Sequence, residues 1–295
     1  MTSLRHQVLA TLISKFRGAG EVTDPEQARA EKLAAQARAT GEPPRLWTRG
    51  LEVGRIDGHD FPVHDVRVAG TSPQRTLFYL HGGGYVSGLD SAHWRYVDRL
   101  ARRFDLRVVL PDYPLAPNHS WRDSHESMVK LFEQVAIESP RGVVLAGDSA
   151  GGGYALSVAQ QVATRPGPQP TDLVLIAPWV DLTGKTPGIE EAAARDSWLR
   201  LSRLRLYGQW WAGGDDLERP EVSPLNGDLS RLPRALMWCG TRDLLQPQCR
   251  LLADRAASQG WDLTYVEEPG LIHVYPLMPI PEARRAMAEL TDFLG

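Results

Sequence analysis

Short apolar runs alternate with longer amphipathic stretches along most of this chain, and this alternation restricts its fold more than any other feature. Beyond about residue 45, apolar runs of roughly five to seven residues are separated by segments of roughly ten to seventeen residues with helical character. The pattern is typical of strands joined by crossover helices in a mostly parallel sheet. Because most runs are continuously apolar, we expect the strands to be covered by helices on both faces.

The apolar runs predict seven strands, over residues 61–68, 76–80, 107–110, 142–146, 173–177, 235–239 and 263–266. Helices are predicted between them, near residues 90–103, 122–138, 149–164, 198–212, 247–259 and 281–293. This order predicts an α/β domain.

The chain before residue 45 has a different, Ala-rich helical pattern, in which Asp24 before Pro25 is typical of a helix start. A chain of 295 residues can form one large core. We therefore expect a helical cap segment over residues 1–45 and one α/β domain over residues 46–295, with an inserted cap helix at about residues 185–220.

That inserted segment contains the most aromatic part of the chain. The stretch between residues 197 and 211 carries four large rings, at Trp198, Tyr207, Trp210 and Trp211. A helix this aromatic packs over something apolar, which is either the core of the protein or a bound ligand. The sequence leaves both interpretations open.

One strand, turn and helix occur in direct succession around Ser149. The turn has the pattern G-x-S-x-G, with Gly147 and Gly151 two residues to either side of the serine. In so tight a turn larger side chains at these two positions would clash, and the serine is held exposed in a strained backbone conformation. The five-residue pattern alone is weak evidence, but its strand-turn-helix setting is what a nucleophilic serine requires. The N–H groups at the start of the helix would face the reacting atoms.

A serine nucleophile needs a general base and an acid that orients the base, and after this type of turn the acid precedes the histidine. Asp243 follows the next-to-last predicted strand and His273 follows the last one. His273 is also the only histidine beyond residue 125, so it has no rival. Among competing acids, Asp262 precedes the last strand, and Glu267 and Glu268 lie too close in sequence to the histidine.

A second glycine-rich loop, Gly82-Gly83-Gly84, follows the predicted strand at 76–80. Three successive residues without Cβ let the backbone approach a ligand closely. We assign the backbone N–H groups of Gly83, Gly84 and Ala150 to the oxyanion hole of a tetrahedral intermediate. Neither a Walker pattern nor G-x-G-x-x-G spacing is present, which disfavours a phosphate-binding loop. His81 is expected to brace the loop rather than react.

Composition excludes several other classes of protein. The formal net charge is −3 and the basic residues are scattered, which disfavours nucleic acid as a partner. Two cysteines are too few for a disulfide framework or a zinc site. No apolar run approaches the ~20 residues of a membrane helix, and no clear cleavage site follows the N-terminal apolar stretch. We expect a cytoplasmic protein with no metal or cofactor, and an exposed edge strand makes a homodimer conceivable.

The motifs HGGG, at His81–Gly84, and GDSAGG, at Gly147–Gly152, make the chain resemble the hormone-sensitive-lipase-like esterases of the α/β-hydrolase fold. The likeness continues through residues 112–119, 177–183 and 222–225 and covers roughly residues 45 to 295. It implies an eight-stranded, mostly parallel sheet, a small helical cap, and cofactor-free hydrolysis of short to medium acyl esters. The triad and oxyanion donors it implies coincide with those chosen from the residues.

Two positions depart from the family pattern. Pro114 stands where the family usually has Arg, and Asn118 where it has Glu. A structural ion pair is therefore expected to be missing, which puts the local support of Tyr113 and Asp148 in question.

The substrate is left open by the sequence. We expect four aromatic side chains to contact it and to favour short chains, namely Tyr85, Trp198, Tyr207 and Trp211. The same triad could serve an amidase or a deacetylase, because it does not distinguish an alcohol from an amine leaving group. A ligand receptor that has lost catalysis is the alternative outside the enzymes, although such proteins generally lack a triad residue.

Overall fold

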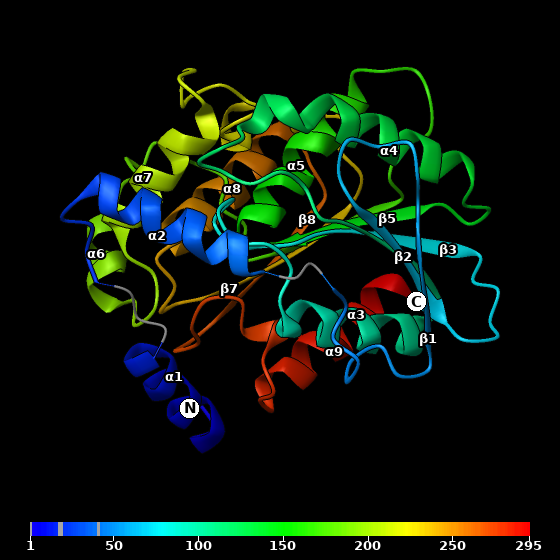
Figure 1. Ribbon diagram of the computed structural model, residues 1–295, viewed down its shortest axis with the longest axis horizontal. Coiled ribbons are helices and arrows are strands. Elements are labelled where there is room, and N and C mark those ends of the chain that lie inside the picture. Colours follow the sequence, from blue (N-terminus) through cyan, green and yellow to red (C-terminus); the bar gives the residue numbers. More distant parts are fainter. Residues whose placement is uncertain (1, 17–19, 40–41) are drawn as a thin grey trace.

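The computed structural model describes residues 2–16, 20–39 and 42–295, and within them the strands form one eight-stranded sheet (Figure 1). The order across the sheet is β1-β2-β4-β3-β5-β6-β7-β8. The pairs β1–β2 and β2–β4 are antiparallel, and all later neighbours are parallel. The strands are β1 Leu51–Arg55, β2 Val63–Val68, β3 Arg75–Leu80, β4 Leu106–Pro111, β5 Val143–Asp148, β6 Asp172–Ile176, β7 Ala235–Gly240 and β8 Leu263–Glu268.

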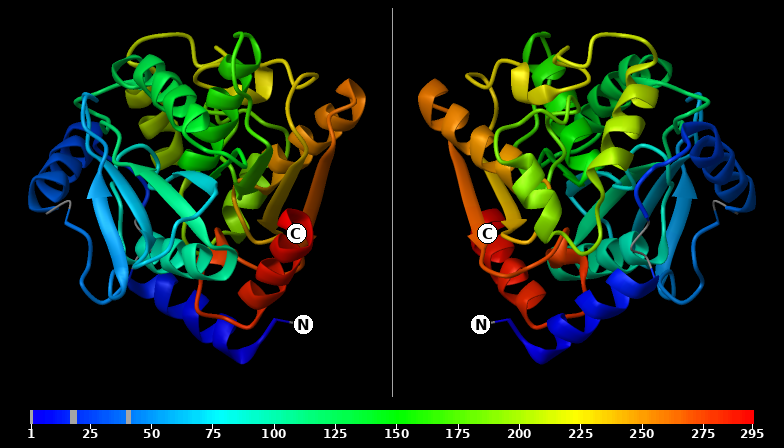
Figure 2. Two further views of the ribbon diagram at one scale, coloured as in Figure 1. Left: turned by 90° about the vertical axis from the view of Figure 1, so that its right-hand side faces the viewer. Right: turned by 90° about the vertical axis from the view of Figure 1, so that its left-hand side faces the viewer.

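Helices cover both faces of this sheet, as the continuous apolar runs predicted. Helices α3 and α9 lie on one face and α4, α5 and α8 on the other (Figures 1 and 2). The helices of the described residues are α1 Leu4–Phe16, α2 Pro25–Arg38, α3 Ser91–Phe104, α4 His125–Ile137, α5 Ala150–Ala163, α6 Ile189–Arg195, α7 Leu201–Ala212, α8 Gln246–Gln259 and α9 Glu282–Leu294. The α/β-hydrolase fold class expected from the sequence is confirmed.

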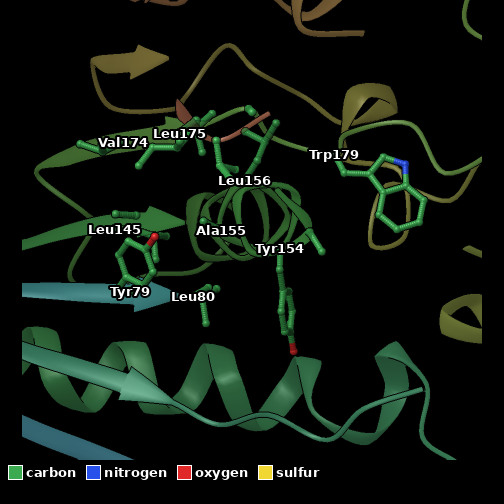
Figure 3. Packing of buried hydrophobic residues seen from close by; sticks show 14 of the residues in the cluster. Tyr79, Leu80, Leu145, Tyr154, Ala155, Leu156, Val174, Leu175 and Trp179 are labelled. Carbon is green, nitrogen blue, oxygen red and sulfur yellow. The ribbon is translucent and has the colours of Figure 1, made fainter. Parts of the chain in front are cut away.

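The centre of the core is the unit formed by β5 and α5. Every residue of β5 is buried, and α5 is buried almost all round. Figure 3 shows α5 packed against the sheet, with Leu156 near Leu175, while Tyr154 points away toward a neighbouring segment. There its hydroxyl lies 2.8 Å from Ser124 Oγ, beside the start of α4. Burial on all sides fixes the turn between β5 and α5 in place.

The two N-terminal helices pack onto the α/β body. The N–H of Ser3, just before α1, donates to Glu282 Oε1 at the start of α9 over 2.5 Å. From α2, the amide of Gln36 donates to the carbonyls of Val86 and Ala116. Asp24 accepts two backbone N–H groups at the start of α2, in agreement with the predicted helix start.

Two features differ from the elements predicted. Strand β1 was not predicted because it is a half-exposed edge strand, interrupted by Gly54, and has no continuous apolar run. The inserted cap segment at about residues 185–220 contains two helices, α6 and α7, rather than one, and only α7 falls in the aromatic stretch. The helical expectation for residues 17–19 and 40–41 lies outside the described residues.

Among the helices of the described residues, none has the length and apolar character needed to cross a membrane.

Candidate active site

Ser149 lies at the sharp turn between β5 and α5. Its φ of 53° and ψ of −122° place a non-glycine residue in a strained backbone conformation. A Cβ on Gly151 would lie 2.1 Å from a carbonyl oxygen of β3, and one on Gly147 would lie 2.3 Å from the Gly151 carbonyl oxygen. Both glycines of the motif are therefore required by close backbone contacts, as the sequence predicted.

Backbone hydrogen bonds tie this turn to the end of β6. The N–H of Ser149 donates to Ile176 O over 2.8 Å, and its carbonyl accepts from Trp179 N–H over 2.8 Å. The backbone of Ser149 is thus held at the tip of the turn by two buried residues, Ile176 and Trp179.

The structure brings the three predicted triad residues into one hydrogen-bonded chain. His273 Nε2 lies 2.9 Å from Ser149 Oγ, and His273 Nδ1 lies 2.8 Å from Asp243 Oδ2. The three residues follow the carboxyl ends of β5, β7 and β8. Asp243 is fully buried and His273 is only 4% exposed. Water is therefore largely kept from the hydrogen bond between them.

The loops that carry Asp243 and His273 are bonded to each other. The hydroxyl of Thr241 accepts the N–H of Gly270 over 2.8 Å, and Arg242 N–H donates to Leu271 O over 3.0 Å. Asp243 Oδ1 accepts the N–H of Leu245, which leaves Oδ2 to face the imidazole. These contacts fix the direction of the carboxylate.

The environment of His273 favours its protonated form. Burial of the ring opposes a positive charge, but the hydrogen-bonded carboxylate of Asp243 outweighs burial and raises the pKa of His273 above its ordinary 6.5. Asp196 and Asp148 act in the same direction. An imidazole with a raised pKa is well suited to accept the proton of Ser149.

The three rival acids lie elsewhere. The carboxylate of Glu267 accepts hydrogen bonds from Arg250, Gln246 and Tyr265. The carboxylate of Glu268 forms an ion pair with Arg285. Asp262 precedes β8, so it lies at the edge of the sheet opposite the triad. Asp243 is the acid that contacts His273.

The loop of Gly83 and Gly84 faces the serine across the candidate oxyanion site. Both glycines have positive φ, 119° and 64°, and both line the same cavity as Ser149 and His273. Ala150 is the first residue of α5, where backbone N–H groups have no partner within the helix. The positions of the three predicted donors are compatible with an oxyanion hole.

His81 braces this loop, as expected. Its Nδ1 lies 2.8 Å from Gly82 O, and its ring stacks on Tyr113 with centroids 4.2 Å apart. The Tyr113 hydroxyl donates to His81 O over 2.7 Å. At one departure from the family pattern, Asn118 accepts from Arg29 over 3.3 Å. His81 therefore holds Tyr113 in place without the ion pair that is common in the family.

Asp148, the residue before the serine, is supported by a group that the sequence did not suggest. Its Oδ1 accepts the hydroxyl of Tyr79 over 2.7 Å and the N–H of Gly82 over 3.0 Å. His93 Nε2 also lies 3.5 Å from the same oxygen. No motif marks His93, because it comes from α3, far from the serine in sequence.

A second carboxylate near the triad was also missed. Asp196 is buried, and its Oδ2 accepts the N–H of Leu244, next to Asp243. Its Oδ1 accepts the N–H groups of Trp198 and Leu199, and the Trp198 ring meets His273 edge-on at 5.6 Å. Asp196 thus joins the turn that carries Asp243 to Trp198 in the wall of the cavity. Only its position two residues before Trp198, typical of an Asx turn, could have indicated this role.

A cavity of about 700 Å³ opens above the triad. Trp198 and Tyr207 line it, as predicted for substrate contacts. Tyr85 and Trp211 do not, and this expectation is corrected. Their rings stack on each other with centroids 4.3 Å apart, and each is only 1% exposed. Trp211 lies on the face of α7 that is turned toward the core, and Tyr85 packs against it there.

Comparison with known proteins agrees with this geometry. A family model described as alpha/beta hydrolase fold matches residues 77–277. An acetyl-hydrolase of Streptomyces hygroscopicus is 32% identical over 226 residues, 75% of each chain. An esterase of Acinetobacter venetianus is 26% identical over 256 residues, 85% of this chain and 82% of the relative.

Among solved structures, an esterase from the bacterial hormone-sensitive lipase family superimposes with a TM-score of 0.84 at 24% identity, covering 100% of this chain and 98% of that one. The esterase EstE5, soaked with p-nitrophenyl butyrate, also gives a TM-score of 0.84 at 24% identity, with 99% and 97% covered. The matched residues, the shared fold and the HGGG and GDSAGG motifs establish that the chain belongs to the alpha/beta-hydrolase-fold family.

Proposed function

We propose that the chain is a serine carboxylesterase in which Ser149 is the nucleophile. The observation that carries this proposal is the chain of hydrogen bonds from Ser149 Oγ through His273 to Asp243 at the floor of the cavity. A serine hydroxyl within hydrogen-bond reach of a base that is itself oriented by an acid is the arrangement that acyl transfer requires.

In the first half of the proposed reaction, Ser149 Oγ attacks the ester carbonyl while His273 Nε2 takes its proton. The oxyanion that forms accepts hydrogen bonds from the N–H groups of Gly83, Gly84 and Ala150. Collapse of this intermediate breaks the ester bond. His273 then gives its proton to the leaving alcohol, and the acyl group stays on Ser149.

In the second half, His273 removes a proton from water, and the resulting hydroxide equivalent attacks the acyl-enzyme. The same donors hold the second oxyanion, and the carboxylic acid leaves as Ser149 regains its proton. Asp243 keeps Nδ1 protonated and stabilises the imidazolium in both halves. No metal or cofactor is needed for any step.

Two segments are proposed to form the cap, residues 1–45 and about 185–220. Their helices supply much of the cavity wall, with Leu9, Leu12 and Ile13 from α1, Lys32 from α2, and Arg203, Leu204 and Tyr207 from α7. A wall built from these helices would limit the length of the acyl chain.

We propose short to medium acyl esters as substrates. Curated relatives are named acetyl-hydrolase and esterase, and the similar esterase EstE5 was soaked with a butyryl ester. A rate series on p-nitrophenyl esters from acetate to laurate tests this proposal. We expect the highest kcat/KM between acetate and octanoate, and a maximum at laurate would contradict it.

The competing enzyme function is amide or acetyl-amide hydrolysis by the same triad. Matched ester and amide substrates with one acyl group separate the two, and faster turnover of the amide would favour the competitor. A catalytically silent receptor is disfavoured because all three triad residues are present and hydrogen-bonded. A cytoplasmic location and a homodimer stay predictions from the sequence.

A further inference from the structure

Four basic side chains line the wall of the cavity above Ser149. They are Lys32 of α2, Arg95 of α3, Arg200 just before α7, and Arg203 of α7. All four are half-buried. Arg200 has a carboxylate, that of Glu21, at 3.9 Å, whereas the other three form no ion pair within the described part of the chain. Positive charge in this wall is therefore mostly unneutralised.

Two of these cations flank a tyrosine that touches the candidate oxyanion loop. A Cβ on Gly84 would lie 3.2 Å from Tyr207 Cδ2, so the ring packs directly against that glycine. Lys32 Nζ lies 5.2 Å from the centre of the Tyr207 ring, and Arg203 Nη1 donates to its hydroxyl over 3.2 Å. Lys32 comes from α2 and Arg203 from α7, so the two cations reach Tyr207 from different helices. The Tyr207 ring thus contacts both cations and Gly84 of the candidate oxyanion loop.

The carboxylates of the same wall do not balance these charges. Asp90 and Asp148 line the cavity, and both contact the imidazole of His93. Burial opposes the charged form of His93, but the two carboxylates outweigh it and raise the pKa of this ring to about 10, so both carboxylates face a cation other than the four above. Among the described residues that line the cavity, positive groups therefore outnumber negative ones, although the chain as a whole has a formal net charge of −3.

Most of the other side chains in the wall are apolar. They include Leu9, Leu12, Ile13, Leu204, Leu277 and Met278. A small inorganic anion would gain nothing from these side chains. An organic molecule with both a carbon chain and a charged group would use both parts of the wall.

We propose that the cavity selects esters whose acyl or alcohol part carries an anionic group, held by Lys32 and Arg203 on either side of Tyr207. The inference rests on the proposed function, because it names the substrate class of the same site. A guanidinium and an ammonium both bind carboxylates through charge-assisted hydrogen bonds. The carbon chain of the ester then lies along the apolar wall.

The test compares esters that differ only in charge. Monoethyl adipate is matched with ethyl hexanoate for a charge on the acyl side, and 4-carboxyphenyl butyrate with phenyl butyrate for a charge on the alcohol side. The measured quantity is the ratio of kcat/KM for the charged ester to kcat/KM for its neutral partner. We expect a ratio above one in at least one pair, and a decrease of about tenfold in Arg203→Gln and in Lys32→Met.

Arg205→Gln is the matched control variant. Arg205 lies on the same helix but is exposed, pairs with Glu190 over 2.7 Å and does not line the cavity. We expect it to keep the wild-type ratio. Hydrolysis of the neutral esters with no preference for either charged one, or a ratio that neither Arg203→Gln nor Lys32→Met changes, would overturn the inference alone. Failure to hydrolyse any of the four esters would count against the proposed function instead.

Discussion

The imidazole of His93 contacts the carboxylate of Asp148, the residue directly before Ser149, with 3.5 Å between Nε2 and Oδ1. Burial opposes charge on both groups, but each favours the charged form of the other. The pKa of His93 is raised to about 10, and that of Asp148 is lowered. This buried ion pair supports the turn at Ser149, because Asp148 Oδ1 also accepts the N–H of Gly82.

The first prediction concerns stability as a function of pH. Because the pKa of His93 rises from 6.5 to about 10 on folding, its contribution to stability is complete below about pH 6.5 and is lost as the pH rises toward 10. The free energy of unfolding of the wild type should exceed that of His93→Gln by an amount that shrinks by up to about 1.4 kcal/mol per pH unit across this window. Urea unfolding at several pH values measures the difference. A difference that stays constant with pH would contradict the charged pair.

The second prediction concerns Asp196 as a positioning residue. His273 must be neutral to act as a base, so kcat/KM should rise with pH through its pKa. The charge of Asp196 contributes to the raised pKa of His273, so Asp196→Asn should move this acidic limb to lower pH. The pH profile of ester hydrolysis measures the shift.

Glu191→Gln is the control for this variant, because it removes an exposed carboxylate from nearby α6. We expect its limb to coincide with that of the wild type. A limb that does not move in Asp196→Asn, while the control behaves as expected, would show that Asp196 has no electrostatic effect on the base.

The third prediction separates core from cavity among the tryptophans. Trp211 is buried against Tyr85, so Trp211→Phe should lower the free energy of unfolding by about 1–3 kcal/mol and leave the preference among acyl chains unchanged. Trp198 lines the cavity and contacts His273, so Trp198→Phe should change that preference. Denaturant unfolding and the p-nitrophenyl ester series measure both effects. The opposite assignment of effects would place Trp211, not Trp198, against the substrate.

The positions of Ser149, Asp243 and His273 relative to one another were predicted correctly, because they follow from consecutive residues or from the order of the strands. Ser149 could be recognised because the strand, turn and helix that expose it occupy consecutive residues. Asp243 and His273 could be placed near it because each follows a late strand, and the carboxyl ends of neighbouring parallel strands meet at one edge of the sheet.

The residues placed wrongly or missed depend on tertiary packing. Tyr85 and Trp211 are large aromatic residues of the kind that often line binding sites. Their side chains point into the core instead, because they pack against buried neighbours such as Tyr154, whose ring contacts both. Asp196 and His93 act on residues distant in sequence, so no spacing reveals them. Finding these two residues requires knowledge of which residues are in contact in the folded protein.

The most direct measurement of the central claim is the site of reaction with a fluorophosphonate probe. Mass spectrometry of the intact chain and of its peptides should show one adduct, located on Ser149, with ester hydrolysis lost in proportion to labelling. Ser149→Ala should fold, take no adduct and lose turnover by about a thousandfold or more. An adduct on another residue, or full ester hydrolysis by Ser149→Ala, would contradict the assignment of Ser149 as the nucleophile.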